Sequence, residues 1–191
     1  MKLKQVFAVV LAALLIVAVS VPLFAYNLKA PFASPPVLLT SIGQSADVEM
    51  ARAVMNRLKL AFAQDNLIKA QGLASANAKT LVVVIGGSSK GLGAAGISAD
   101  AELERTRALL AEAKKRGMKI IGMHIGGEAR RGELSDRFIN AAVPMCDYVV
   151  VVEEGNGDGL FTKLCASAKI PLDVVQKISQ VGEPLAAAFI K

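Results

Sequence analysis

Residues 80–98 read TLVVVIGGSSKGLGAAGIS, an uninterrupted apolar run that ends in a segment rich in glycine and serine. The run from Leu81 to Ile85 is largely β-branched, is too short for a typical buried helix, and shows no alternation of apolar and polar residues. These properties are typical of a strand in a parallel sheet whose two faces are both covered. The sequence therefore predicts a central strand with helices on both sides.

The segment after this strand has the composition of a ligand-binding loop. Glycine tolerates positive φ and lets backbone amides approach a ligand closely, as in loops that cradle phosphate. A lysine in such a loop adds a positive charge for an anion. The residues expected to contact a ligand here are Gly86, Gly87, Ser88, Ser89 and Lys90.

Residues 87–93, GSSKGLG, also match the GxxxGxG cofactor loop of short-chain dehydrogenases. That family uses a Tyr-x-x-x-Lys pair for proton transfer, and neither Tyr26 nor Tyr148 begins such a pair. The next helix is expected to start only near Asp100, which makes the loop longer than a tight dinucleotide turn. A dinucleotide is therefore not favoured, and the cofactor stays unknown.

Residues 1–25 have the features of an export signal. Lys2 and Lys4 precede an apolar run from Val6 to Ala25, with Pro22 and the small Ala25 near its end. Cleavage after Ala25 would make it a signal peptide, whereas an uncleaved run of about 20 residues is long enough to span a bilayer. We therefore expect an exported protein, extracellular or in the cell envelope, with a membrane tether through residues 6–25 as the second form.

The rest of the chain divides into a short tether and one domain. Residues 26–36 contain three prolines and no periodic pattern, which indicates an extended tether. Residues 37–191 are enough for a single α/β domain with its own core. The formal net charge is +6, but the domain has no Lys/Arg-rich run and no Trp, so no nucleic-acid partner is expected.

Strands and helices are expected to alternate along the domain. The expected strands are 37–40, 81–85, 119–125 and 148–152, with weaker candidates at 67–71 and 173–178. The expected helices follow Ser45, span 100–116 and 133–142, precede Ser167, and close the chain at 183–190. This order predicts an α/β fold, a three-layer Rossmann-like or flavodoxin-like domain with a mostly parallel sheet of about five strands.

Polar residues cluster where the predicted strands end. Parallel strands bring their carboxyl ends to one edge of the sheet, where such folds bind ligands. Arg130 and Arg131 follow a Gly-Gly turn, a suitable place to hold a carboxylate or phosphate. Together with the glycine loop, they predict a site for a small polar, anionic ligand. Its other expected contacts are Ser41, Gln44, Ser45, Asn156 and Asp158.

Several residues have two interpretations. His124, the single histidine, could act as a general base with Asp136 or Glu128 in a hydrolase or transferase, or could be a half-buried structural residue. Asn156 and Asp158, with Glu153 and Glu154, could form an oxygen-rich cation site, although their spacing is not that of an EF-hand. Helix capping by Asp158 is the favoured alternative. A third function class is a tethered structural or protein-interaction module.

No Cys/His cluster has the spacing of a metal site, and the oligomeric state stays open. In an exported chain, Cys146 and Cys165 could form a disulfide, but the expected heights of their elements differ. Two buried thiols are the alternative.

Three loops carry a resemblance to a known family. They are GGSSKGLGAAGI from Gly86 to Ile97, the MHIGG, RRG and SD segments between His124 and Asp136, and the EEGNGDGLF segment from Glu153 to Phe161. Between Pro36 and Phe189 the chain resembles a family of exported bacterial domains of unknown function. The resemblance implies an α/β fold and export, and it implies no activity.

Overall fold

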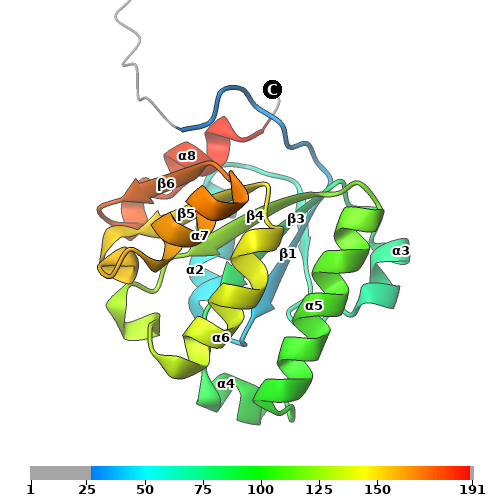
Figure 1. The fold of residues 1–191 in the computed structure, drawn as a ribbon. Coiled ribbons are helices and arrows are strands. Elements are labelled where there is room, and N and C mark those ends of the chain that lie inside the picture. Colours follow the sequence, from blue (N-terminus) through cyan, green and yellow to red (C-terminus); the bar gives the residue numbers. More distant parts are fainter. Residues whose placement is uncertain (1–26, 190–191) are drawn as a thin grey trace, which may run out of the picture.

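The computed structural model describes residues 27–189 (Figure 1). They form a six-stranded, all-parallel sheet in the order β2-β1-β3-β4-β5-β6. The strands are β1 (Val37–Ile42), β2 (Phe62–Gln64), β3 (Thr80–Ile85), β4 (Lys119–His124), β5 (Tyr148–Val152) and β6 (Leu172–Val175). The predicted α/β fold is confirmed with one strand more than expected, and the order of the first five strands is flavodoxin-like.

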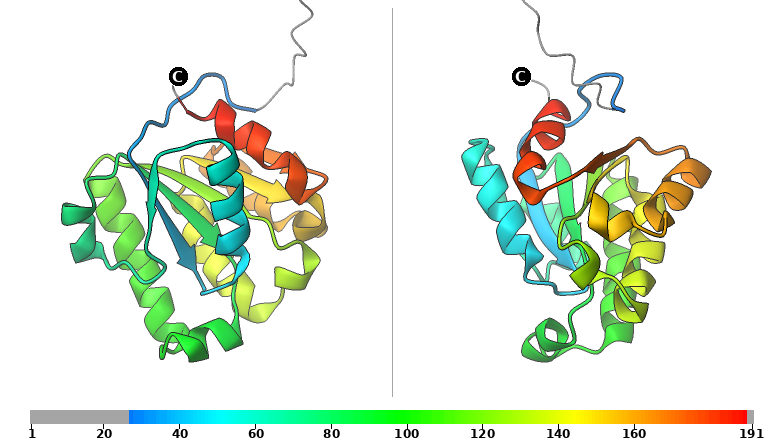
Figure 2. Two further views of the ribbon diagram at one scale, coloured as in Figure 1. Left: turned by 180° about the vertical axis from the view of Figure 1, so that it is seen from behind. Right: turned by 90° about the vertical axis from the view of Figure 1, so that its left-hand side faces the viewer.

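Helices cover both faces of this sheet (Figure 2). One face carries α2 (Asp47–Arg57) and α8 (Gly182–Ala187). The other carries α3 (Leu73–Ala76), α4 (Ser89–Ala94), α5 (Ala99–Lys115), α6 (Glu133–Ala142) and α7 (Leu160–Ala168). Short 3₁₀ turns connect them: η1 (Ala70–Gly72), η2 (Glu128–Arg130), η3 (Val143–Met145), η4 (Glu153–Asn156) and η5 (Ile178–Gln180).

The burial of β3 explains why its sequence does not alternate between apolar and polar residues. Leu81, Val83 and Ile85 pack into the core beneath α5 and α6. Val82 and Val84 pack into the core on the α2 side. At most 1% of any of these side chains is exposed, so every position of the strand must be apolar.

Two expected elements differ in the structure. The second strand is Phe62–Gln64 and not residues 67–71, because α2 ends at Arg57 and Lys59 adopts a left-handed φ of 55° that turns the chain into the sheet. The glycine-rich segment is not one long loop, since residues 89–94 form helix α4. The following helix starts one residue before Asp100, and the Ser98 hydroxyl caps it by accepting from the Ala101 amide at 3.1 Å.

The segment before β1, which the sequence suggested as a tether, is hydrogen-bonded to the domain. The amides of Phe32 and Ala33 both donate to the Ala188 carbonyl at 2.9 Å, and Ala33 is fully buried. The Ser34 amide donates to the Thr80 hydroxyl at 3.1 Å. Residues 27–36 are therefore part of the packed structure.

The predicted export signal, residues 1–25, lies outside the described residues. Within 27–189, no helix combines the length and the apolar character that crossing a bilayer requires.

Candidate functional site

The glycine loop uses its amides within the fold. The amides of Gly86, Gly87 and Ser88 each donate a 2.9 Å hydrogen bond, to Ile42, Ser135 and Gly43 respectively. Ser89 and Lys90 lie exposed in the first turn of α4. The expected anion cradle is therefore not formed by the first three residues, because their donors already have partners.

Helix α4 packs against the loop that follows β1. A Cβ on Gly91 would lie 1.8 Å from the Gln44 carbonyl oxygen, so only glycine fits there. In contrast, a Cβ on Gly93 would meet nothing within 4 Å. Close packing against Gln44 therefore requires glycine at position 91, whereas position 93 has room for a side chain.

The expected ligand residues after β1 are also engaged. Ser41 is buried, and its hydroxyl donates to the Ser45 carbonyl at 3.4 Å. The Ser45 hydroxyl accepts from the Asp47 amide at 3.1 Å. The Gln44 side-chain amide donates to the Asn66 carbonyl at 2.9 Å. These contacts shape the loop and do not direct its polar groups at a common point.

Sequence reasoning missed a buried ion pair that holds this loop. The Glu102 carboxylate accepts from the Gly43 amide at 2.8 Å and from the Gln44 side chain at 3.0 Å. It also pairs with Arg105 at 2.7 Å. An acidic residue in the first turn of a helix is usually a solvated one that interacts with the helix dipole, so its local pattern does not indicate this role. The position of Glu102 next to Thr106 and Leu110 on the face that packs against the sheet was the available signal.

The two arginines after β4 have different partners. Arg130 pairs with Asp47 at 3.1 Å. Arg131 lies between Asp136 and Asp158, 2.8 Å from each carboxylate. Its guanidinium therefore has a raised pKa, and it holds the pKa of the Asp158 carboxyl well below the usual range. Both arginine charges are already balanced, so the structure does not present them as a joint anion site.

Lys90 does not join these arginines. Among the described residues it makes no ion pair, and it lines neither the pocket beside Arg131 nor the one beside Gly126. The three cations expected to share one ligand therefore do not meet in a common pocket.

The residues after β5 cap helix α7. The Asn156 side-chain oxygen accepts from the Phe161 amide at 3.0 Å, and the Asp158 carboxylate accepts from the Leu160 amide at 3.1 Å. Capping is thus one role of Asp158, as the sequence suggested, and its salt bridge with Arg131 is a second.

His124 is fully buried at the end of β4. Its Nδ1 lies 2.8 Å from the Ile85 carbonyl oxygen, and its ring lies 4.9 Å from the Phe161 ring, centroid to centroid. Nε2 has no hydrogen-bond partner among the described residues. Burial is the main cause of the lowered pKa of this imidazole. A neutral ring under apolar neighbours favours the structural interpretation over a general base.

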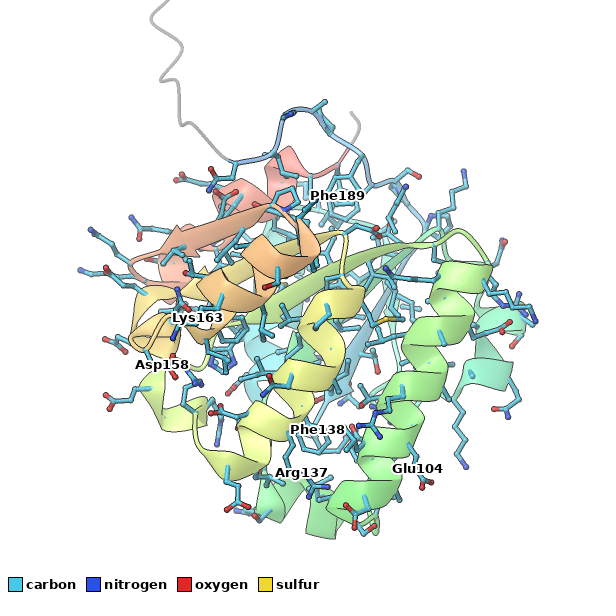
Figure 3. The ribbon with its side chains drawn as sticks, in the orientation of Figure 1. Glu104, Arg137, Phe138, Asp158, Lys163 and Phe189 are labelled. Carbon is cyan, nitrogen blue, oxygen red and sulfur yellow. The ribbon has the colours of Figure 1, made fainter. Side chains whose placement is uncertain are left out.

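An open pocket of about 580 Å³ lies at the carboxyl edge, between η2, the start of α6 and η4. Figure 3 shows one of its residues, Asp158, with Lys163 of α7 beside it. The lining residues are Glu128, Arg131, Gly132, Asp136, Glu154, Gly157 and Asp158. Four carboxylates and one guanidinium make this lining acidic, although the sequence led us to expect an anion site.

Glu154 was considered only with Glu153, Asn156 and Asp158 as a cation site that the sequence did not favour, and Glu128 and Asp136 were named only as partners of His124. Glu128 and Glu154 follow β4 and β5 closely, and this position was the available signal, whereas Asp136 lies within α6. No group of His, Cys, Asp or Glu side chains within residues 27–189 is arranged to hold a metal ion.

Both cysteines are free thiols in the structure. Cys146 and Cys165 are 3% and 2% exposed. Burial raises the pKa of Cys146, and it raises that of Cys165 to about 11. The structure therefore agrees with the alternative of two buried thiols.

Solved structures with a similar chain path include three bacterial hydrolases. Esterase EstA from Pseudoalteromonas sp. has 10% identity and a TM-score of 0.36, over 75% of this chain and 78% of its own. A GDSL-like lipase from Bacteroides thetaiotaomicron has 11% identity and a TM-score of 0.35, over 89% and 76%. An acylhydrolase described as putative, from Bacteroides fragilis, has 10% identity and a TM-score of 0.34, over 78% and 72%.

At this level of identity and superposition, the likeness carries no inference about activity. A search of curated protein sequences found no match to this chain. A family model does match it, over residues 34–189, which agrees with the resemblance noted between Pro36 and Phe189. The chain belongs to the family described as a domain of unknown function, DUF6305.

Proposed function

We propose that this chain is an exported domain that binds a small polar molecule in the pocket at the carboxyl edge of its sheet. The observation that supports the proposal is the pocket of about 580 Å³ between η2, α6 and η4. Open parallel sheets bind ligands at this edge. A hollow of this size is in the range of small-molecule sites.

The lining favours a cationic group on the ligand, in place of the anion expected from the loops. Arg131 is already paired with Asp136 and Asp158. Glu128 and Glu154 make no ion pair within the described part of the chain, and both are exposed. An amine or guanidinium group would gain charge-assisted hydrogen bonds from these two carboxylates.

An enzyme that uses His124 is less well supported. No part of the imidazole is exposed, and His124 does not line the pocket. A reacting group would need direct or water-mediated access to Nε2. The backbone at Gly155 packs so closely that a Cβ there would lie 2.8 Å from Nε2.

Thermal unfolding of the full chain tests the proposal. The panel contains 1,4-diaminobutane, arginine, lysine and choline, with phosphate, citrate and glucuronate as anionic counterparts. A compound at about a hundred times its dissociation constant adds about 2.7 kcal/mol to the free energy of unfolding. For a chain of this length we expect that gain to raise Tm by roughly 5–10 °C.

Adjacent glutamates provide a matched control. Glu154 lines the pocket, whereas its neighbour Glu153 does not. We expect Glu154→Gln to reduce the shift caused by a cationic compound and Glu153→Gln to leave it unchanged. A response to anions alone would contradict the charge assignment. No response to any compound would favour a structural or protein-interaction module.

A further inference from the structure

The end of the sheet opposite the pocket carries a basic surface. Lys79 precedes β3, Lys119 begins β4, and Arg116 follows the last turn of α5. These three side chains line an open hollow of about 290 Å³ together with Phe32 and Ser34 of the first described segment. We define the basic end as these three residues together with Lys114 and Lys115, which directly precede Arg116 in the sequence, and Lys29 of the first described segment.

Most of these charges are not neutralised. Glu112 pairs with Arg116 at 2.7 Å and lies 3.8 Å from Lys115. The exposed lysines of the basic end that make no ion pair within residues 27–189 are Lys29, Lys79, Lys114 and Lys119. The basic end therefore has a net positive charge, whereas the pocket at the other edge is acidic.

The chain enters the fold at this same end and is fixed there. The Asn27 amide donates to the Asp173 carboxylate at 3.0 Å, and the Asn27 side chain donates to the Leu172 carbonyl at 2.5 Å. Asp173 is only 7% exposed, and it also accepts a hydrogen bond from Tyr148. Figure 1 shows the segment after Asn27 crossing the end of the sheet where β1 starts and α5 finishes.

The length of the preceding sequence adds a geometric constraint. The apolar run from Val6 to Ala25 has about the number of residues that a helix needs to span a bilayer. Only Tyr26 separates this run from Asn27. A run that stayed in a membrane would therefore place Asn27 within a few residues of the bilayer surface. Tyr26 alone is too short a linker to let the domain reorient freely relative to the bilayer.

We propose that residues 6–25 remain in the chain as an anchor and that the basic end rests on an anionic bilayer surface. Lysines near such a surface are attracted to it, by about fivefold in affinity for each charge. The acidic pocket would be repelled from the same surface, so both ends favour one orientation. The pocket then faces away from the bilayer. The inference does not depend on what the pocket binds.

The test uses the full chain reconstituted into vesicles, with a fluorophore at one of two exposed alanines. Ala30→Cys places the fluorophore at the basic end, and Ala94→Cys places it on α4 at the opposite edge. The native cysteines are buried and do not compete for labelling of the folded chain. A quencher is attached to lipid headgroups, and the vesicles contain phosphatidylcholine with or without 30% phosphatidylglycerol.

We expect strong quenching at residue 30 and weak quenching at residue 94 in the anionic vesicles, with a contrast that decreases as salt is added. A triple variant, Lys29→Gln, Lys79→Gln and Lys119→Gln, should reduce the population in this orientation at least tenfold. The matched Lys→Arg variant keeps the charge and should behave as the parent chain does.

Equal quenching at the two positions would overturn the proposal. An unchanged contrast in the Lys→Gln variant, or in vesicles without the anionic lipid, would also overturn it. Recovery of the chain from cells only in a form that lacks residues 1–25 would do the same, because the anchor would then be absent.

Discussion

The carboxylate of Glu102 lies 2.7 Å from the guanidinium of Arg105, one turn further along α5, with the two side chains 0% and 8% exposed. Arg105 also donates to the carbonyls of Ser41 and Ile68, while Glu102 accepts from the Gly43 amide. One ion pair thus joins the end of β1 and the segment before α3 to the helix. Its charges satisfy backbone groups that would otherwise be buried without partners.

Removing one charge of this pair should strongly destabilise the fold. Glu102→Gln leaves the Arg105 charge buried without its counter-ion, and we expect a loss of about 3–5 kcal/mol in the free energy of unfolding. Glu112→Gln is the control, because the Glu112 pair with Arg116 is much more exposed and should contribute less than about 1 kcal/mol. Urea unfolding of both variants measures the difference. Losses of equal size would contradict the buried role of Glu102.

Two glycines of α4 should respond oppositely to alanine. Gly91→Ala brings a Cβ to 1.8 Å from the Gln44 carbonyl oxygen. The helix or the loop must then move, at a cost of roughly 1–3 kcal/mol or more. Gly93→Ala meets nothing within 4 Å and should stabilise the helix by about 0.5–1 kcal/mol. Thermal unfolding separates the two outcomes, and a destabilising Gly93→Ala would show that α4 is not helical there.

His124 should make stability depend on pH in the weakly acidic range. Its folded-state pKa is lowered by burial, so below about pH 6.5 the unfolded chain takes up a proton that the folded chain does not. The free energy of unfolding therefore falls as the pH drops from about 7.5 towards the folded pKa, by at most about 1.4 kcal/mol per pH unit. Urea midpoints at several pH values measure the slope.

The variant His124→Gln isolates this contribution. It should lower stability at every pH, because the packing against Phe161 is changed, but the slope due to this single histidine should disappear. Identical slopes in the two proteins would place the imidazole in contact with water.

The thiols should be protected by burial alone. In the folded chain we expect Cys146 and Cys165 to react slowly with iodoacetamide, since burial raises the pKa of both and lowers the fraction of reactive thiolate. In denaturant without reductant, both should be alkylated. A mass that shows no added groups under the second condition would indicate a disulfide and would contradict the structure.

The long elements could be predicted from the sequence because local pattern and burial agree in them. The runs from Leu81 to Ile85 and from Tyr148 to Val152 are buried on both faces, and 133–142 is a helix as expected. The short elements could not be predicted, for a physical reason. Strand β2 has three residues and α4 has six, so their conformations depend on contacts with β1 and Gln44 that no local pattern shows.

The sequence predicted where the candidate site lies but not which of its charges are paired. The parallel sheet brings the loops after β1, β3, β4 and β5 to one edge, and composition identified those loops. The salt-bridge partners of the two arginines could not be predicted from the sequence. Arg131 is balanced by Asp158, which is 27 residues away in the sequence, and Arg130 by Asp47, which is 83 residues away. Pairings over such separations decide which charges stay unpaired at this edge, and no local pattern shows them.

The short parallel bridge between Ala33 and Phe189 has a consequence for handling the protein. It brings the segment before β1 and the last described residues together at the edge of the sheet remote from the pocket (Figure 3, where Phe189 is labelled). A purification tag, a fluorescent protein or a surface linker attached after Phe189 would therefore start beside the segment around Ala33. The carboxyl edge, with Glu128 and Glu154, would stay open for ligand titrations on an immobilised sample.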